Sequence, residues 1–376
     1  MEDKINIFIS GDFFGSNRLE KFIIDENYDK IFHDIMPEIK NADIAITNLE
    51  SPVTLLLRSI NKTGPAIKAN PKTMAALKYA GINLVTLANN HIMDYGAQGL
   101  TDTINSCKKN MIDFVGAGLN VDEAAKPFII TVKGKKIAFI NIAENEWSTT
   151  DGKMPGANPL NPFTNFYTIQ QARYESDHVF VIIHGGHEKY SLPSPGMKQL
   201  YRFFIDAGAD AVIGHHTHFY SGYEIYKGRP IFYSLGNFIF DSLSVIDPRW
   251  HEGFAVKFII DHNGISFHMI PFIQMKGNVM LRKMNSEEHN QFDQEIMRLN
   301  RIIADDNELE KHFSEFILKM KKQYLAFLEP HSNRFIYALQ SRHLFPSFLS
   351  KKKRLLYRNL MRCEAHREIV LNLLEK

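Results

Sequence analysis

Three histidines near the middle of the chain have the residue types and spacing of a metal-binding segment. In AVIGHHTH, an apolar and strand-like run leads into His216 and His218, which lie two residues apart. On an extended backbone, residues two apart point their side chains to the same face, so both imidazoles can bind one cation. The segment therefore predicts a buried strand whose end presents two metal ligands.

Four further polar clusters follow strand-like runs earlier in the chain. In chain order they supply Asp12 in ISGDF, Asn48 and Glu50 in AITNLE, Asn90 and His91 in VTLANNH, and His184 in VFVIIHGGHE. In open α/β sheets, binding sites form beyond the carboxyl ends of the strands, so we expect these side chains to meet the two histidines at one point. The loop after His184 opens with two glycines and carries His187 and Glu188. We expect these two residues, and also Asn48, to contact substrate.

Each of these residues has a simpler structural explanation when it is considered separately. Asp12 can cap the next segment, Asn48 is typical of a turn, and Glu50 is typical of a solvated surface. An Asn90–His91 pair is common in turns, and a buried histidine such as His184 is usually bonded to a carbonyl group. Their joint occurrence at successive strand ends favours a shared site.

The mixture of donor types narrows the choice of metal. Carboxylate, amide and imidazole donors without thiolate suit Mn²⁺, Fe, Zn²⁺ or Co²⁺, whereas Ca²⁺ prefers oxygen ligands throughout. The candidate ligands are more than one tetrahedral ion needs, so we expect two divalent ions. Two neighbouring ions can hold a phosphate between them and lower the pKa of a bridging water.

The composition is that of an ordinary globular protein. The chain has 376 residues, of which 44% are hydrophobic and 23% charged, and its formal net charge is +2. This charge predicts no general attraction to nucleic acid. Cys107 and Cys363 match no zinc or redox spacing. With no signal-peptide pattern at the start and no run of about 18 apolar residues, we expect a cytoplasmic protein.

Short β-branched or aromatic runs alternate with helix-like segments over roughly the first 280 residues, which indicates an α/β domain with mostly parallel central strands. Strands are expected to begin at Ile5, Asp43, Asn83 and His178. Helices are expected from Pro71, with Gly81 as a stop signal, and from Ala97. Hairpin turns are expected at Gly134, Gly228 and Asn263–Gly264. The pattern predicts a mixed sheet, or two sheets stacked between helical layers.

After about residue 285 only helical periodicity remains. Apolar residues recur at helical spacing, namely Phe292, Ile296, Leu299, Ile303, Leu309, Phe313, Ile317, Met320 and Tyr324. We therefore predict one domain over residues 1–284 and a helical C-terminal segment over 285–376. Its end, from Ser350, is basic. A solvated helix face is the expected explanation; the alternative is docking to an acidic partner, a nucleic acid or a membrane surface.

The order of these motifs resembles a known pattern. The calcineurin-like metallophosphoesterases carry D-x-H, GDxxD, GNH[DE], a lone histidine and GHxH, each after a strand. More closely, GDFF, TNLESPVT, NNHIMDYG, HGGHE, GHHTH and YSLGNFIFD are similar to the bacterial capsule-synthesis (CapA-type) family associated with poly-γ-glutamate. The resemblance covers about residues 5–245, and it implies a four-layer α/β/β/α sandwich with a helical C-terminal appendage.

The resemblance also implies a role for each matching residue. Metal ligation is implied for Asp12, Glu50, Asn90, His184, His216 and His218. His91 matches the histidine that gives a proton to the leaving oxygen or stabilises its charge. Asp94, three residues later, is expected to orient that imidazole.

Several positions depart from the broader superfamily pattern. Phe14 stands where D-x-H has its histidine, Asn89 where GNH has its glycine, and His215 where GHxH has its glycine. Loss of the D-x-H histidine removes one ligand from the first metal, so the two metals are not expected to bind with equal affinity. We expect His215 to face away from the site.

The resulting hypothesis is a metal-dependent hydrolase of phosphoester or related bonds, set by the resemblance in capsule, poly-γ-glutamate or cell-envelope polymer synthesis. Its substrate is expected to be an anionic small molecule or polymer, and membrane partners of capsule synthesis would bring it to the membrane. One alternative is a non-hydrolytic metal-binding component of a capsule synthesis or export assembly. Another is a nucleic-acid or membrane-surface binder that acts through the basic tail.

Overall fold

The computed structural model describes residues 4–62, 64–242, 247–277, 280–328, 333–354 and 357, without the side chains of 321–328. The chain divides into two compact units, Met1–Leu309 and Glu310–Lys376. The predicted domain boundary after residue 284 stays a prediction. Cys363 and most of the basic C-terminal stretch lie outside the described residues.

The larger sheet contains the N-terminal strand and has the order β16-β15-β14-β1-β2-β3-β4, with β13 also paired to β1. Its strands are β1 (Ile5–Phe14), β2 (Ile44–Leu49), β3 (Leu84–Thr86), β4 (Asp113–Val115), β13 (Asn237–Phe240), β14 (Glu252–Asp261), β15 (Gly264–Gln274) and β16 (Leu281–Lys283). Strands β1 to β4 and β13 run parallel, whereas β14 to β16 pair antiparallel. The expected parallel centre with antiparallel hairpins is confirmed.

The second sheet has the order β11-β12-β10-β9-β7-β6. Its strands are β6 (Phe128–Val132), β7 (Lys135–Ala143), β9 (His178–His184), β10 (Ala211–His215), β11 (Tyr223–Tyr226) and β12 (Arg229–Phe232). A separate two-stranded sheet pairs β5 (Ala117–Gly118) with β8 (Gly156–Ala157). Strands β7, β9, β10 and β12 are parallel, and β6 and β11 close hairpins at the turns expected around Gly134 and Gly228.

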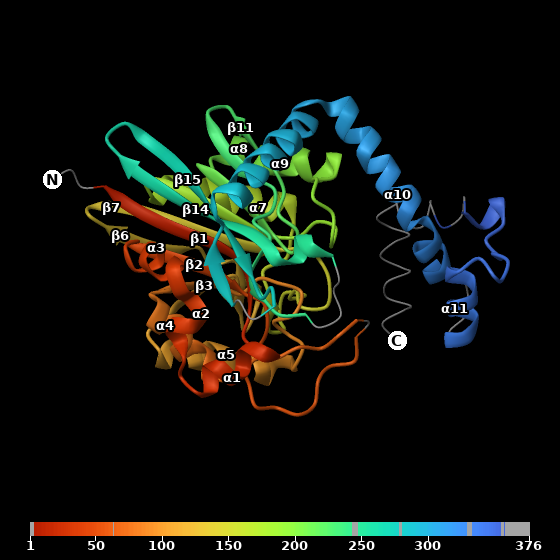
Figure 1. Ribbon diagram of the computed structural model, residues 1–376, viewed down its shortest axis with the longest axis horizontal. Helices are drawn as coiled ribbons and strands as arrows, with labels where there is room; N and C mark the ends of the chain where they lie inside the picture. The colour runs from red at the N-terminus through yellow and green to blue at the C-terminus, as the bar shows by residue number, and fades with distance from the viewer. Residues whose placement is uncertain are drawn as a thin grey trace. The chain divides into compact units, whose positions relative to one another are not determined.

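The two sheets pack face to face, and helices cover their outer sides (Figure 1). Within β1, Ile7 and Ile9 join the core that contains the second sheet, whereas Phe8 joins the core beneath the helices of the first sheet. This alternation is the period of two that a strand buried on both faces requires. Between the sheets, the Phe180 ring of β9 meets Phe258 of β14 edge to face, with centroids 5.1 Å apart. The predicted α/β/β/α sandwich is confirmed.

Short helices follow the strands of each sheet. The helices between the strands of the first sheet are α1 (Arg18–Ile24), α2 (Tyr28–Phe32), η1 (His33–Ile35), α3 (Met36–Lys40), α4 (Thr73–Ala80) and α5 (Gly96–Lys109). The second carries α6 (Val121–Ala125), α7 (Pro162–Glu175) and α8 (Pro195–Ala207), and η2 (Pro248–His251) precedes β14. The helix expected from Pro71 begins two residues later, since Lys72 is its N-cap, and Gly81 ends it at φ 102°.

The last described elements are α9 (Ser286–Ala304), α10 (Asp306–Leu328) and α11 (Arg334–Ser341), so the predicted helical C-terminal region is present. Phe292 and Ile296 of α9 are buried in the core of the first unit. On α10, Ile317 is half exposed, and the Tyr324 side chain lies outside the described residues. Among the described helices, none is both long and apolar enough to cross a membrane.

Candidate metal centre

Three neighbouring parallel strands bring the first polar residues together. Asp12 of β1 pairs in register with Asn48 of β2 on one side and with Asn237 of β13 on the other. We expected Asp12 at the end of its strand and Asn48 after its strand, but both lie within their strands. The ladders with β2 and β13 extend β1 as far as Phe13 and Phe14. Backbone pairing on both sides therefore fixes the position of the Asp12 carboxylate.

The second sheet contributes the histidines from its facing strand ends. His184 is the last residue of β9 and pairs with Ala143 of β7 and His215 of β10. His216 follows directly. His215 is fully buried in the strand, and neither of its ring nitrogens has a hydrogen-bond partner.

The backbone that carries His216 and His218 is not extended. Both residues have positive φ, 93° and 61°, which is uncommon outside glycine. The N–H of His216 donates to Oδ2 of Asp12 at 3.1 Å, and the Thr217 hydroxyl donates to the carbonyl of Phe219 at 2.7 Å. The expectation that an extended chain points both imidazoles to one face is wrong. A tight bend held by a distant carboxylate brings them to the site instead.

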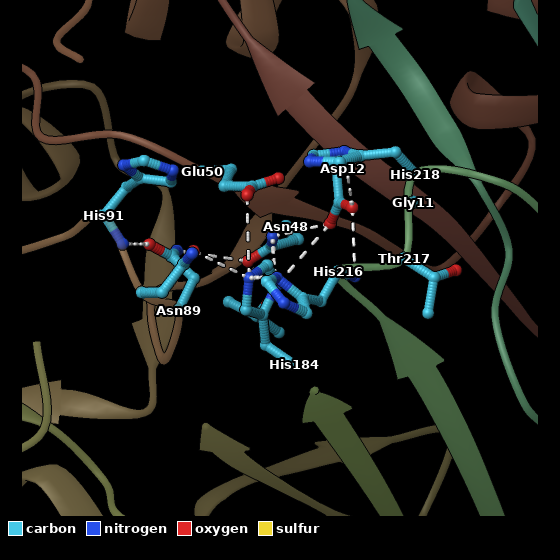
Figure 2. A network of polar contacts seen from close by, with 12 residues as sticks. Gly11, Asp12, Asn48, Glu50, Asn89, His91, His184, His216, Thr217 and His218 are labelled. Carbon is cyan, nitrogen blue, oxygen red and sulfur yellow. Dashed lines mark hydrogen bonds and ion pairs between the residues drawn. The ribbon is translucent and has the colours of Figure 1, made fainter. Parts of the chain in front are cut away.

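His184 lies at the centre of the polar cluster (Figure 2). Its Nε2 atom is 3.0 Å from Nδ1 of His216, 3.0 Å from Oδ1 of Asn90 and 3.6 Å from Oε1 of Glu50. Its Nδ1 atom is 3.2 Å from Nδ2 of Asn48. Side chains from three other segments of the chain thus converge on one imidazole.

Two overlapping groups in this cluster have the composition of a metal site. Glu50, His184 and His216 form the first group, and Asp12, Glu50 and His218 form the second. Within each group, one ligand atom from every member lies within 4.8 Å of the others. Glu50 belongs to both groups, which is the position expected of a bridging carboxylate.

The Glu50 carboxylate tests whether a cation fits here. The side chain is fully buried, and neither carboxylate oxygen has a hydrogen-bond partner. Burial raises its pKa well above the usual range, and the nearby Asp12 charge adds to the shift. A buried carboxylate is costly unless a positive charge compensates it, and its ionisable neighbours, Asp12 and the neutral His184, supply none. The orphaned oxygens therefore fit a bound cation.

The electrostatics of the other candidate ligands agree with this fit. Burial raises the pKa of Asp12 to about 7, against hydrogen bonds from Asn48 and His216 that lower it. Burial lowers the pKa of His216 to about 3 and that of His218 to about 4, and it lowers the pKa of His184 well below its ordinary value. The imidazoles are thus neutral, the form that binds a metal.

His91 belongs to a second buried network beside the cluster. Its Nδ1 atom lies 2.7 Å from Oδ2 of Asp94, as expected for an orienting carboxylate. Lys62 donates to Oδ1 of the same carboxylate at 2.5 Å, and the N–H of Ile67 donates to Oδ2 at 2.8 Å. The Lys62 side chain is only 4% exposed. The residue type of Lys62 does not by itself predict this ion pair, because the partner Asp94 lies 32 residues later in the chain.

Asn89 and Asn237 also form hydrogen bonds with residues of the site. Asn89 accepts a hydrogen bond from the N–H of His91 at 3.1 Å and donates to Oδ1 of Asn48 at 3.3 Å. Asn237 has Oδ1 2.9 Å from Nδ1 of His218. Only the packing of β2, β13 and the intervening loops reveals these contacts.

The loop after His184 lies at the edge of the cluster. The Glu188 side chain is exposed, but its charge raises the pKa of both Glu50 and His216. Burial lowers the pKa of the partly buried His187. Substrate contact by these residues and by Asn48 stays a prediction. Glu144 directly follows β7, and burial raises its pKa to about 7. A carboxylate directly after a strand-like run is the same pattern that indicated the other candidate ligands, so the sequence could have indicated this residue too.

Comparisons with known proteins agree with the motif pattern. A family model described as "Bacterial capsule synthesis protein PGA_cap" matches residues 6–242. "Capsule biosynthesis protein CapA" of Bacillus anthracis is 33% identical over 64% of this chain and 60% of that protein. "PGA biosynthesis protein CapA" of Bacillus subtilis (strain 168) is 33% identical over 64% of each chain. The match thus spans less than two thirds of either relative.

Structural likenesses are more distant. The crystal structure of 5'-nucleotidase from Candida albicans SC5314 is 12% identical, covers 86% of this chain and 59% of its own, and gives a TM-score of 0.41. A likeness at this level does not bear on activity.

Proposed function

The chain belongs to the bacterial capsule synthesis protein (PGA_cap) family, and from this premise we propose that it is a metal-dependent hydrolase of phosphoester or related bonds in capsule or cell-envelope polymer synthesis. The names of the two Bacillus relatives, one for capsule and one for PGA biosynthesis, support the setting. The observation that carries the activity is the buried, orphaned Glu50 carboxylate shared by two groups of candidate ligands.

In this proposal the two groups hold two divalent ions, of Mn, Fe or Zn. Asp12 and His218 serve one ion, His184, His216 and Asn90 serve the other, and Glu50 is shared. When bound, such ions polarise a phosphoryl oxygen and lower the pKa of a water molecule. Each of these side chains is less than a tenth exposed, so the chain excludes bulk water from the reacting centre.

The chain itself handles the proton of the leaving group. Asp94 engages Nδ1 of His91, so a proton destined for the leaving oxygen is carried at Nε2. Lys62 and the N–H of Ile67 hold the Asp94 carboxylate in place. His91 can therefore assist departure of the leaving group without reorienting. The substrate in this proposal is an anionic small molecule or polymer, and membrane partners would bring the chain to the envelope.

The test measures metal content and hydrolysis together. Protein purified without chelator is analysed for bound metal, and nitrophenyl phosphate esters are assayed with added Mn²⁺. We expect Asp12→Ala and His216→Ala to lose metal and activity. His91→Ala should keep its metal and lose about 10²- to 10⁴-fold in rate, whereas His268→Ala, at an exposed position of β15, is the matched control.

Two outcomes would contradict the proposal. Retention of metal by both ligand variants would exclude the shared centre. Stoichiometric metal with no hydrolysis, and no effect of His91→Ala on any ester tested, would favour the non-hydrolytic assembly component.

A further inference from the structure

Asn237 lies against one of the candidate metal ligands and is fully buried. It begins β13 and is the register partner of Asp12 on β1. Its Oδ1 atom lies 2.9 Å from Nδ1 of His218, and its Nδ2 atom donates to the carbonyl of Trp250 at 3.2 Å. The same amide thus joins a structural carbonyl to a candidate ligand.

The Trp250 carbonyl determines which way this amide faces. A carbonyl oxygen only accepts hydrogen bonds, so the NH₂ group of Asn237 must face it, and the oxygen of the amide must face His218. Gln274 also donates to the Trp250 carbonyl, at 2.6 Å, so this oxygen is held by two donors. The orientation of the Asn237 amide is therefore fixed by its surroundings.

This orientation determines the tautomer of His218. Because Oδ1 of Asn237 can only accept, Nδ1 of His218 must carry the hydrogen, and Nε2 keeps a free lone pair. The ring itself is packed against two aromatic side chains, with centroids 5.0 Å from Phe240 and 4.6 Å from Trp250. Packing therefore fixes the imidazole plane, and the Asn237 amide fixes which ring nitrogen carries no hydrogen.

We propose that Asn237 is a positioning residue of the metal centre: it holds His218, whose Nδ1 lies 3.8 Å from Oδ2 of Asp12, in the Nδ1–H tautomer, and so leaves Nε2 as the ring nitrogen that can bind a divalent cation in the group with Asp12 and Glu50. The inference rests on the metal site of the proposed function but not on hydrolysis. A histidine ligand whose other nitrogen is hydrogen-bonded is fixed in tautomer and orientation, and loss of such a partner typically costs about 10- to 100-fold in metal affinity.

The test combines two measurements that do not involve catalysis. Mn²⁺ and Zn²⁺ affinities are measured by calorimetry, and the His218 tautomer is read from imidazole ¹⁵N shifts in chelated protein. Asn237→Leu removes the acceptor, and we expect a mixed tautomer and about 10- to 100-fold weaker binding of one ion. Asn237→Asp keeps an acceptor toward His218 but loses the donor to the Trp250 carbonyl, so we expect it to restore the Nδ1–H tautomer and most of the metal affinity.

Gln274→Leu is the matched control. It removes a donor from the same Trp250 carbonyl and also the acceptor of the Phe240 N–H, but it removes no hydrogen bond of His218, so it should reproduce any structural damage but leave tautomer and affinity unchanged. An Nε2–H tautomer in wild-type protein would overturn the inference, even if Asn237→Leu does not fold. So would unchanged affinity in Asn237→Leu, or an equal loss in Gln274→Leu. A wild type that binds no metal would instead refute the proposed function, and this inference with it.

Discussion

The Nε2 atom of His184 and the Nδ1 atom of His216 face each other across 3.0 Å at the junction of the two sheets. Their ring centroids are 4.6 Å apart, and burial holds the pKa of both imidazoles far below the ordinary histidine value. Two neutral imidazoles this close can share a cation in place of a proton. The predictions below follow from this arrangement and from the networks around it.

Replacing Glu50 should separate stability from metal binding. Glu50→Gln removes a fully buried carboxylate that has no hydrogen-bond partner, a feature whose cost is about 1–3 kcal/mol. In chelator at pH 8, we expect the variant to unfold with a free energy at least as large as that of the wild type, as measured by urea titration. Its metal affinity should be lost. A clearly less stable variant would show that the carboxylate has a compensating partner within the protein.

The stabilising effect of metal should grow as the pH rises. Burial raises the pKa of Asp12 from 3.8 to about 7, so its contribution to the stability of chelated protein is full below pH 3.8 and is lost as the pH rises to about 7. Bound metal requires the ionised form. The difference in Tm between Mn²⁺-loaded and chelated protein should therefore increase from pH 5 to pH 8.

Titration of the histidine ligands changes stability with pH in the opposite direction. It affects chelated and Mn²⁺-loaded protein almost equally, so it largely cancels in the Tm difference. The lowered pKa of His216 gives a contribution that is present above pH 6.5 and lost as the pH falls to about 3. His216 is neutral in chelated and loaded protein alike over most of the range. A Tm difference that shrinks as the pH rises would contradict the raised pKa of Asp12.

Removal of Lys62 should destabilise the fold through Asp94. Lys62→Met leaves the fully buried Asp94 carboxylate without its cation, and breaking a buried ion pair in this way costs about 3–5 kcal/mol. Chemical unfolding should show this loss. Lys68→Met is the control, because Lys68 lies on the same loop but donates to the Leu56 carbonyl. Equal losses in the two variants would point to the loop rather than to the ion pair.

Asn141 should be a structural link between the sheets. Its side-chain oxygen accepts the N–H of Ala88 at 2.6 Å, and its amide nitrogen donates to the carbonyl of Ile182 at 3.2 Å. Asn141→Ala leaves these two buried backbone groups without hydrogen-bond partners, and each loss costs about 1–3 kcal/mol of folding stability. Exposed Asn145, which donates to Leu160, offers the control Asn145→Ala. A loss no greater than that of the control, measured by urea unfolding, would mean that water or a rearranged neighbour replaces the amide.

Much of the fold was predictable because its signals are local. The hairpin of β14 and β15 was expected from Asn263–Gly264, although the pairing of Asp261 with Gly264 makes His262 and Asn263 the turn residues. The insertion of β13 beside β1 was not predictable, because it joins segments more than 200 residues apart in the printed sequence. Short-range patterns fix which runs become strands, but not which distant strands become neighbours.

The sequence by itself determined the donor types of the candidate centre and the strands that carry them, since apolar runs and side-chain chemistry are properties of the chain. Only the tertiary structure decided how His216 and His218 reach the site. Their positive φ values accompany a bend that the Asp12 carboxylate holds from another sheet. The tertiary structure also buries the Glu50 carboxylate without a hydrogen-bond partner and pairs Lys62 with Asp94. Burial and pairing depend on atoms brought together from distant parts of the chain, and no local pattern encodes them.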